Sequence, residues 1–191
     1  LLSLAKQDAG QIDKAVVTRL DHVAKAVVAD LMPMASQKNL DLGFTRIEPI
    51  TVQGDAIVIG TLIRNLVENA LRFTPSGGRV DIGVYGAPDG AVLQVEDTGP
   101  GVPASDRERI FEPFDRGSRP SGDGTGLGLA IVKRIVERLA GSISIANATD
   151  PVDSGLSVTV VLPADGVTGA AVPGAGAMAG ENAPSDAARP A

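Results

Sequence analysis

Residues 65–75 read NLVENALRFTP, and two glycine-containing stretches follow them along the chain. Residues 96–101 read EDTGPG, and residues 122–128 read GDGTGLG. Each stretch offers one group that a magnesium-bound nucleotide requires: an amide oxygen for the metal, a carboxylate for the base, and backbone N–H groups for the phosphates. None of the three would indicate a nucleotide-binding site alone, but together and in this order they do.

The composition is that of one folded domain with appended segments. The 191 residues are 43% hydrophobic but only 3% aromatic, so the core must be built from aliphatic side chains. The formal net charge of -6 argues against a nucleic-acid partner, which would need a basic face. The sequence has no cysteine, which excludes disulfides, thiolate metal sites and cysteine nucleophiles.

Three segments are expected along the chain. Residues 11–163 form the folded domain, and residues 164–191 have the Ala-, Gly- and Pro-rich composition that is typical of disorder. Residues 1–10 look like the end of an amphipathic helix. Because the chain starts at Leu1 without Met, we expect it to be a fragment of a longer protein.

Apolar periodicity predicts three helices and several strands. We expect the first helix to kink or break at Pro33, the second to begin after Asp55 as its N-cap, and the third to end at Gly141. Strands are expected around residues 80–84, 93–97, 143–145 and 156–162, and one face of the sheet should be covered by helices. The apolar stripes of the three helices are Val16, Leu20, Val23, Val27, Leu31 and Met34; Ile59, Ile63, Leu66 and Ala70; and Leu127, Ile131, Ile135 and Leu139.

The second predicted helix also has a polar face. Asn65, Asn69 and Arg72 follow one another at i, i+4 and i+7, so they line up along that face. The amide oxygen of Asn69 is a suitable ligand for Mg²⁺, and Asn65 is suited to hold phosphates or a bridging water. The alternative is a pair of solvated asparagines; the alignment with Arg72 and the downstream glycine stretches favours the site.

Asp97 ends a predicted strand and enters a turn with glycines at 99 and 101. The glycines allow a planar ring to approach the backbone closely. The carboxylate would accept a hydrogen bond from the exocyclic amine of adenine and repel the carbonyl oxygen of guanine, so adenine is the predicted base. The alternative is an aspartate that only caps a turn.

The second glycine stretch directly precedes the third predicted helix. Its N–H groups and the helix N terminus are suited to bind an anion. The stretch has neither the spacing of a Rossmann fingerprint nor the Gly-Lys-Ser/Thr of a Walker loop. A flexible linker is the alternative, but linkers rarely open into a helix of strong apolar periodicity.

The segment between the two glycine stretches contains Phe111 and Phe114, which are expected to anchor a mobile lid. Arg116 and Arg119 are candidates to bind phosphates from this lid, with solvated loop arginines as the alternative. His22 is the only histidine of the chain and lies off the apolar stripe of its helix, so we do not expect it to accept a phosphoryl group.

Together these stretches resemble the catalytic, ATP-binding domain of bacterial sensor histidine kinases, in the superfamily shared with gyrase, the heat-shock chaperone ATPase and mismatch-repair ATPases. Residues 65–75 resemble the N box of that family, and residues 97–101 its first glycine box. Residues 111–114 resemble the F box, and residues 122–128 the second glycine box. Gly155 resembles the closing glycine before the last strand. Residues 1–10 resemble the end of the second helix of the dimerisation domain that precedes the catalytic domain in this family.

The resemblance implies an α+β fold of the Bergerat type: a two-layer α/β sandwich whose mixed, mostly antiparallel sheet of about five strands is covered on one face by three helices. It implies ATP and Mg²⁺ as ligands, with Asn69 on the metal and Asp97 on adenine. Leu139 and Ala140 depart from the family, which often has His-Gly there. The implied ATP-binding residues are Asn65, Asn69, Arg72, Phe73, Asp97, Gly99, Gly101, Arg116, Gly124, Thr125, Gly126, Leu127 and Gly128.

The resemblance also bears on the reaction. In ATP-hydrolysing relatives and anti-sigma serine kinases of the superfamily, position 65 is usually a glutamate that acts as a base, whereas Asn65 cannot take up a proton. Glu68 does not replace that base, because it is rotated about 100° from Asn69 around the helix; we expect it to pair with Arg72. Poor hydrolysis and transfer of the γ-phosphoryl group are therefore expected.

The implied partners are a histidine-bearing dimerisation domain of the same kinase and the receiver domain of a response regulator. The acceptor histidine and its acidic neighbour are expected upstream of Leu1, so the fragment would hold no catalytic residue and would not phosphorylate itself. We expect a monomeric, cytoplasmic fragment of a homodimeric parent anchored in the bacterial inner membrane. A stand-alone ATPase and a non-enzymatic nucleotide sensor are the alternatives.

Overall fold

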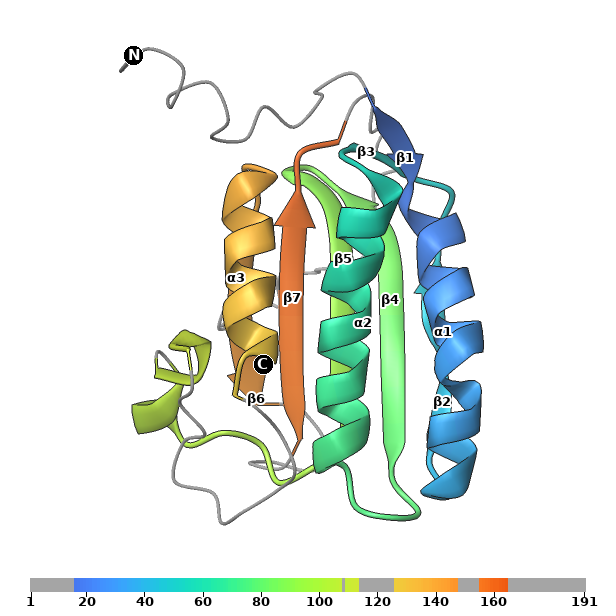
Figure 1. Cartoon of the computed structure of the whole chain (residues 1–191), viewed down its shortest axis with the longest axis vertical. Coiled ribbons are helices and arrows are strands. Elements are labelled where there is room, and N and C mark those ends of the chain that lie inside the picture. Colours follow the sequence, from blue (N-terminus) through green and yellow to red (C-terminus); the bar gives the residue numbers. More distant parts are fainter. Residues whose placement is uncertain (1–15, 108, 114–125, 148–154, 165–191) are drawn as a thin grey trace, which may run out of the picture.

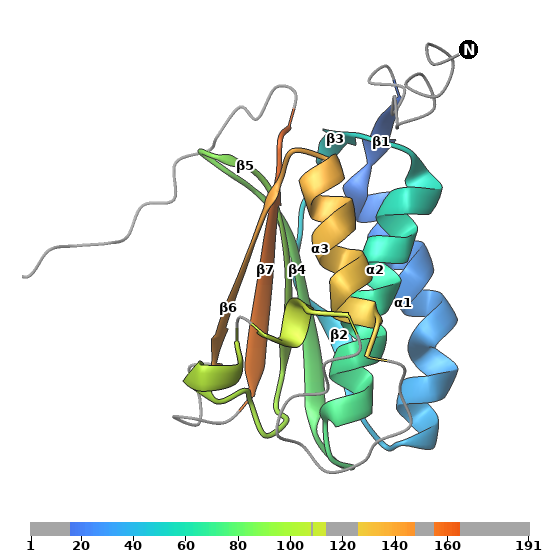
Figure 2. The ribbon, with the colours of Figure 1, turned by 60° about the vertical axis from the view of Figure 1, so that its left-hand side comes forward.

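The described residues fold into two layers, one of three helices and one of β-strands. The computed structural model describes residues 16–107, 109–113, 126–147 and 155–164. The helices α1 (Leu20–Gln37), α2 (Ala56–Phe73) and α3 (Gly128–Arg138) all lie on the same face of the sheet (Figures 1 and 2). The predicted fold class is confirmed.

The main sheet has five strands in the order β2-β4-β5-β7-β6. Only β2 and β4 pair in parallel among them, and the remaining neighbours are antiparallel. The four predicted strands are present. The fifth strand, β2, was not predicted because its sequence does not alternate strictly between apolar and polar residues. The strands are β2 (Asp41–Ile47), β4 (Arg79–Ala87), β5 (Gly90–Asp97), β6 (Ser142–Asn147) and β7 (Leu156–Leu162).

A second, two-stranded sheet joins the starts of α1 and α2. Its strands, β1 (Val17–Arg19) and β3 (Thr51–Gln53), pair antiparallel. The buried hydroxyl of Thr18 donates a hydrogen bond to the carbonyl of Gly54 at 2.6 Å. These strands are too short to show alternation, so the sequence does not predict them.

The centre of the helical layer is α2, which follows the prediction closely. Asp55 is its N-cap, and Oδ1 accepts a hydrogen bond from the N–H of Ile57 at 2.7 Å. The predicted stripe is buried against the sheet together with the residues beside it. The buried residues of α2 are Ile59, Leu62, Ile63, Leu66, Val67, Ala70 and Leu71.

The first helix differs from the prediction at both ends. Val16 is exposed and precedes β1, so the helix begins only at Leu20. Met34 is also exposed, because the buried face is formed by Leu20, Ala24, Val27, Val28, Leu31 and Ala35. Pro33 does not end the helix, which continues to Gln37. The proline lies on the exposed side, so the hydrogen bond that it cannot donate is missing on the side toward solvent.

The third helix buries part of the predicted stripe together with two residues beside it. Leu139 is buried as predicted and Ile135 is half-buried against the core, but Ile131 is exposed. Val132 and Val136, which lie outside the predicted stripe, are fully buried. The helix contacts α2, the sheet and the short 3-10 turn η2 (Arg109–Phe111). Together these neighbours cover a face of α3 that includes the positions one residue after Ile131 and Ile135. Leu127 precedes the helix as its N-cap residue.

The end of α3 is a Schellman motif with an alanine at the left-handed position. The N–H groups of Ala140 and Gly141 donate to the carbonyls of Glu137 at 3.1 Å and Val136 at 2.9 Å. Ala140 has φ +53°, a conformation that favours glycine. Glycine at 141 is required for another reason, because a Cβ there would lie 2.6 Å from the carbonyl oxygen of Val161.

Ala140→Gly should therefore stabilise the protein by about 1 kcal/mol, because it removes the strain of a left-handed alanine at an exposed position. Urea unfolding at equilibrium measures this change. Ala26→Gly is the matched control: Ala26 is exposed in the middle of α1, and the same substitution there should destabilise by about 1 kcal/mol. Equal effects of the two substitutions would contradict the prediction.

Candidate nucleotide-binding site

The predicted site residues that the structure describes gather at one end of the sandwich, the lower end in Figure 1. The helix α2 ends there at Phe73, and the strand β5 ends there at Asp97. The helix α3 begins at the same end, at Gly128. Segments that are far apart in the sequence are thus brought together where α2 and β5 end and α3 begins.

Asn65 lies against the start of α3. Its side chain is half-buried, and Nδ2 donates a hydrogen bond to the carbonyl of Thr61 at 2.8 Å. A Cβ at Gly128 would lie 3.3 Å from Asn65 Oδ1, so glycine at this position allows α3 to begin beside the amide. The N box and Gly128, the last residue of the second glycine box, are therefore neighbours in space. Asn69 lies one turn further along α2 and is also half-buried.

The ion pair of Glu68 differs from the expected one. Glu68 pairs with Arg64, with 3.8 Å between Oε1 and Nη1, and not with Arg72. Arg64 also pairs with Asp30 of α1, with 2.7 Å between Nη2 and Oδ2. This contact across the two helices holds Arg64 beside Glu68, and it could not be read from the sequence of α2. Arg72 is exposed at the end of α2.

Asp97 is buried, with 5% of its surface exposed. Its Oδ1 accepts a hydrogen bond from the N–H of Gly99 at 2.7 Å. A Cβ at Gly99 would lie 2.7 Å from this oxygen and 3.0 Å from the carbonyl oxygen of Phe73. Glycine at 99 is therefore what permits the end of α2 and the end of β5 to approach one another.

Gly101 and Gly155 pack backbone against backbone. Gly101 has φ +64°, and a Cβ there would lie 2.7 Å from the carbonyl oxygen of Gly155. The N–H of Gly155 donates to the carbonyl of Gly99 at 2.5 Å. The turn after Asp97 is thus fixed to the start of β7, and Gly155 occupies the place expected of the closing glycine. Oδ1 of Asn147, at the end of β6, is buried beside this turn.

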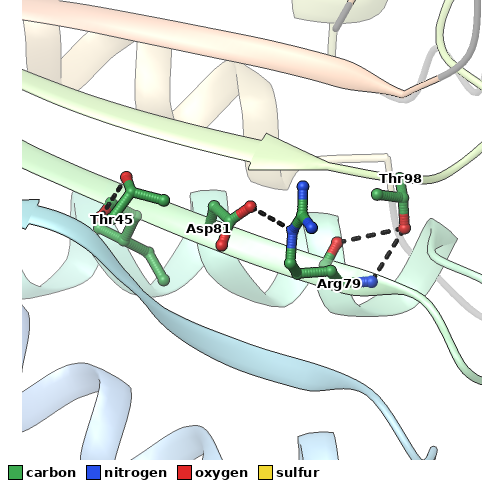
Figure 3. Close-up of polar contacts among 5 residues, drawn as sticks. Thr45, Arg79, Asp81 and Thr98 are labelled. Atoms are coloured by element: carbon green, nitrogen blue, oxygen red, sulfur yellow. Dashed lines mark hydrogen bonds and ion pairs between the residues drawn. The ribbon is translucent and has the colours of Figure 1, made fainter. Parts of the chain in front are cut away.

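Thr98 fixes the other side of the turn, a role that the sequence does not predict. Its N–H donates to the carbonyl of Arg79 at 3.1 Å. Its hydroxyl accepts from the N–H of Arg79 at 2.9 Å and donates to the carbonyl of Arg79 at 3.4 Å (Figure 3). The side chain of Arg79 pairs with Asp81 on the same strand. The same view shows Thr45 of β2, whose hydroxyl donates to the carbonyl of Ile82. The position of Thr98 between Asp97 and Gly99 is the only sequence signal for this role.

Part of the predicted site lies outside the described residues. Phe111 is half-buried in η2, but the lid expected after it falls on residues 114–125, together with Phe114, Arg116, Arg119, Gly124 and Thr125. The lid and its phosphate contacts stay predictions. Gly126 is described, with φ +69°. The expected helix end at residues 1–10 also lies outside the described residues, as does the expected tail apart from its first residue, Ala164, which packs against the core.

His22 is remote from this end of the sandwich, at the start of α1. Its side chain is 65% exposed, and Nε2 lies 3.7 Å from Oδ2 of Asp21. The pKa of the Asp21 carboxyl is held below its usual value by the hydrogen bond from Arg19 Nε, which is 2.8 Å long. Asp21 is therefore engaged in an ion pair with Arg19 at the start of α1.

The sequence family described as "Histidine kinase-, DNA gyrase B-, and HSP90-like ATPase" matches residues 54–166. The chain belongs to this family. The solved structures that it resembles are histidine kinase domains. The mycobacterial sensor histidine kinase MprB has a TM-score of 0.70 and 31% identity, covering 78% of this chain and 98% of that one. The catalytic domain of the histidine kinase ThkA has a TM-score of 0.69 and 26% identity, covering 78% and 95%.

Curated relatives of the chain are also histidine kinases. Over 145 residues the chain is 41% identical to the sensor protein kinase PmrB of Pseudomonas aeruginosa, covering 75% of this chain and 30% of PmrB. Over 170 residues it is 35% identical to the histidine-protein kinase/phosphatase MprB of Mycolicibacterium vanbaalenii, covering 85% and 34%. The chain is a histidine kinase-type ATP-binding catalytic domain, and it spans about a third of these relatives. None of the described helices is both long and apolar enough for a membrane span.

Gly101→Ala should destabilise the protein by about 1–3 kcal/mol more than Gly77→Ala, as measured by urea unfolding. Both glycines have positive φ, of +64° and +84°, so alanine is strained at either position. A Cβ at Gly77 would meet no atom within 4 Å, whereas one at Gly101 would meet the carbonyl of Gly155. The difference between the variants therefore isolates the close backbone approach, and equal losses would refute it.

Proposed function

We propose that this domain binds Mg-ATP and donates the γ-phosphoryl group to a histidine on a dimerisation domain, for relay to a response regulator. The observation that carries this proposal is Asn65. Its amide lies half-buried beside the start of α3, one turn from Asn69, where hydrolysing relatives have a general base. An amide does not take up a proton, so this position cannot activate water.

The residues at this end of the sandwich fit an adenine nucleotide. The buried carboxylate of Asp97 is suited to accept a hydrogen bond from the amine of adenine, and the absence of a Cβ at Gly99 leaves the backbone beside it accessible to a planar ring. The N terminus of α3 is suited to bind phosphates, because its first N–H groups have no partner within the helix. Phe73 contributes its carbonyl next to Gly99.

The donor set also fits a magnesium ion bound together with the phosphates. Asn69 offers a neutral amide oxygen, and Mg²⁺ prefers oxygen ligands and keeps several waters and phosphate oxygens in its shell. The ion would neutralise the charge of the transferring phosphoryl group. Asn65 would hold phosphate or a bridging water, and Arg72, Arg116 and the residues from Gly124 to Gly128 would contribute further contacts to the phosphates.

Phosphoryl transfer depends mainly on positioning and on neutralisation of charge, so the nucleophile can be supplied by another domain. We place the acceptor histidine on a dimerisation domain of the same kinase and the next acceptor on a receiver domain. A homodimeric, membrane-anchored parent with this domain in the cytoplasm belongs to the same proposal, supported by the relatives named as sensor kinases.

The wild-type chain should bind Mg-ATP and label the histidine of a separately produced, matching dimerisation domain. Asn69→Ala should lower the Mg-dependent affinity at least about tenfold, because it removes the metal-binding oxygen. Titration with a fluorescent ATP analogue, with and without Mg²⁺, measures the affinity, and radiolabelled ATP measures the transfer. Glu68→Ala is the matched control on the same helix and should retain both activities.

Each competing function predicts a different outcome. Nucleotide binding without labelling of the histidine would favour a non-enzymatic nucleotide sensor. Steady hydrolysis in the absence of an acceptor, at rates like those of chaperone or gyrase ATPases, would favour a stand-alone ATPase. If Asn69→Ala kept the Mg-dependent affinity, the assignment of Asn69 as the metal ligand would be contradicted, but the proposed function would not.

Asp97→Asn should weaken ATP binding and reduce the preference for ATP over GTP, each by about tenfold. The substitution keeps the size of the side chain and an oxygen that can accept from Gly99, but it removes the carboxylate that repels the guanine carbonyl. Competition titrations with the two nucleotides test this. Asp89→Asn, at an exposed position in the hairpin at the opposite end of β5, is the control and should have no effect.

A further inference from the structure

The ammonium group of Lys38 is bound to the end of α2, although Lys38 follows the last residue of α1. Its Nζ donates to the carbonyls of Leu71 at 2.6 Å, Arg72 at 2.8 Å and Thr74 at 3.2 Å. An ammonium group has three protons, so these three acceptors satisfy it completely. The contacts are charge-assisted and lie where the helix dipole favours a cation.

The same segment of backbone touches the adenine side of the site. The three carbonyls bound by Lys38 flank Phe73, whose own carbonyl oxygen would lie 3.0 Å from a Cβ at Gly99. Gly99 in turn donates its N–H to Asp97 at 2.7 Å. A displacement of the end of α2 by even a fraction of an ångström would therefore press on Gly99 or leave it unsupported.

The turn that follows α2 is fixed from the same side. The N–H of Gly77 donates to the carbonyl of Asn39 at 2.9 Å, and the N–H of Asp41 donates to the carbonyl of Gly78 at 2.9 Å. Residue 79, the next in the chain, is then bound to Thr98 through its backbone (Figure 3). The connection after α1 thus holds both the end of α2 and the turn leading into β4.

We propose that Lys38 is a positioning residue for the adenine contact: it holds the end of α2 so that Phe73 supports Gly99, and through Gly99 the orientation of Asp97. The inference rests on the proposed ATP-binding function and deepens it by linking the end of α1 to the base-binding aspartate. Lys38 itself is half-buried and separated from Asp97 by this backbone, so it acts through other residues and not on the nucleotide.

The test uses Lys38→Met, which keeps most of the length of the side chain and removes the charge and the donors. It should raise the Kd for Mg-ATP about tenfold and lower the ATP-to-GTP preference several-fold, because the carboxylate loses its fixed orientation. Lys25→Met is the matched control on an exposed position of α1 and should leave both quantities unchanged. Thermal unfolding is followed in parallel, and titrations are made well below the unfolding midpoint.

The nucleotide preference separates positioning from a purely stabilising role. A lowered unfolding midpoint with unchanged Kd and preference would show that Lys38 only caps α2, which overturns this inference and leaves the proposed function intact. If Lys38→Met does not fold, Lys38→Gln takes its place, because glutamine retains two donors. This variant should show a smaller loss of ATP affinity and of nucleotide preference. If it showed no loss at all, the inference would be overturned. Failure of the wild-type chain to bind Mg-ATP would overturn both.

Discussion

The burial of one face of α2 is the constraint on which the remaining structure depends. Ile59, Ile63 and Leu71 are fully buried against the sheet and the neighbouring helices, so the helix has a single rotational setting. Because adjacent residues are about 100° apart around a helix, this setting also fixes the side on which Asn65 and Asn69 lie. The packing of the apolar face of α2 therefore determines where its polar face points, and α3 begins beside this polar face.

Local signals explain which parts could be predicted from the sequence. The apolar stripe of α2, its cap at Asp55 and the glycine turn after Asp97 are each encoded within a few residues, and the structure contains all three. The candidate site could be proposed from the same kind of signal, because its asparagines, aspartate and glycines lie in short recognisable stretches. What those stretches do not contain is the reason for Gly99 and Gly101, which is a close approach to the backbone of a segment elsewhere in the chain.

Features that depend on distant partners were not predictable. The edge strand β2 exists because it can pair in parallel with β4, and β1 exists because β3 lies opposite to it. Glu68 pairs with Arg64 because Asp30, on another helix, holds that arginine in place. The stripe predicted for α3 was wrong at Ile131 and omitted Val132 and Val136, because the helix packs on α2 and the sheet at once and periodicity alone does not specify two neighbours.

The β1–β3 ribbon gives α1 and α2 a common origin. The N–H of Leu20 donates to the carbonyl of Ile50, and the N–H of Gly54 donates to the carbonyl of Val16, both within 2.9 Å, so the segments entering the two helices are bonded to one another. Because α1 and α2 are joined at their starts in this way, they resist sliding past one another along their axes. A pull applied to the chain ahead of β1 would load both helices together, and it would act as a shear force on the ribbon before it stretched either helix.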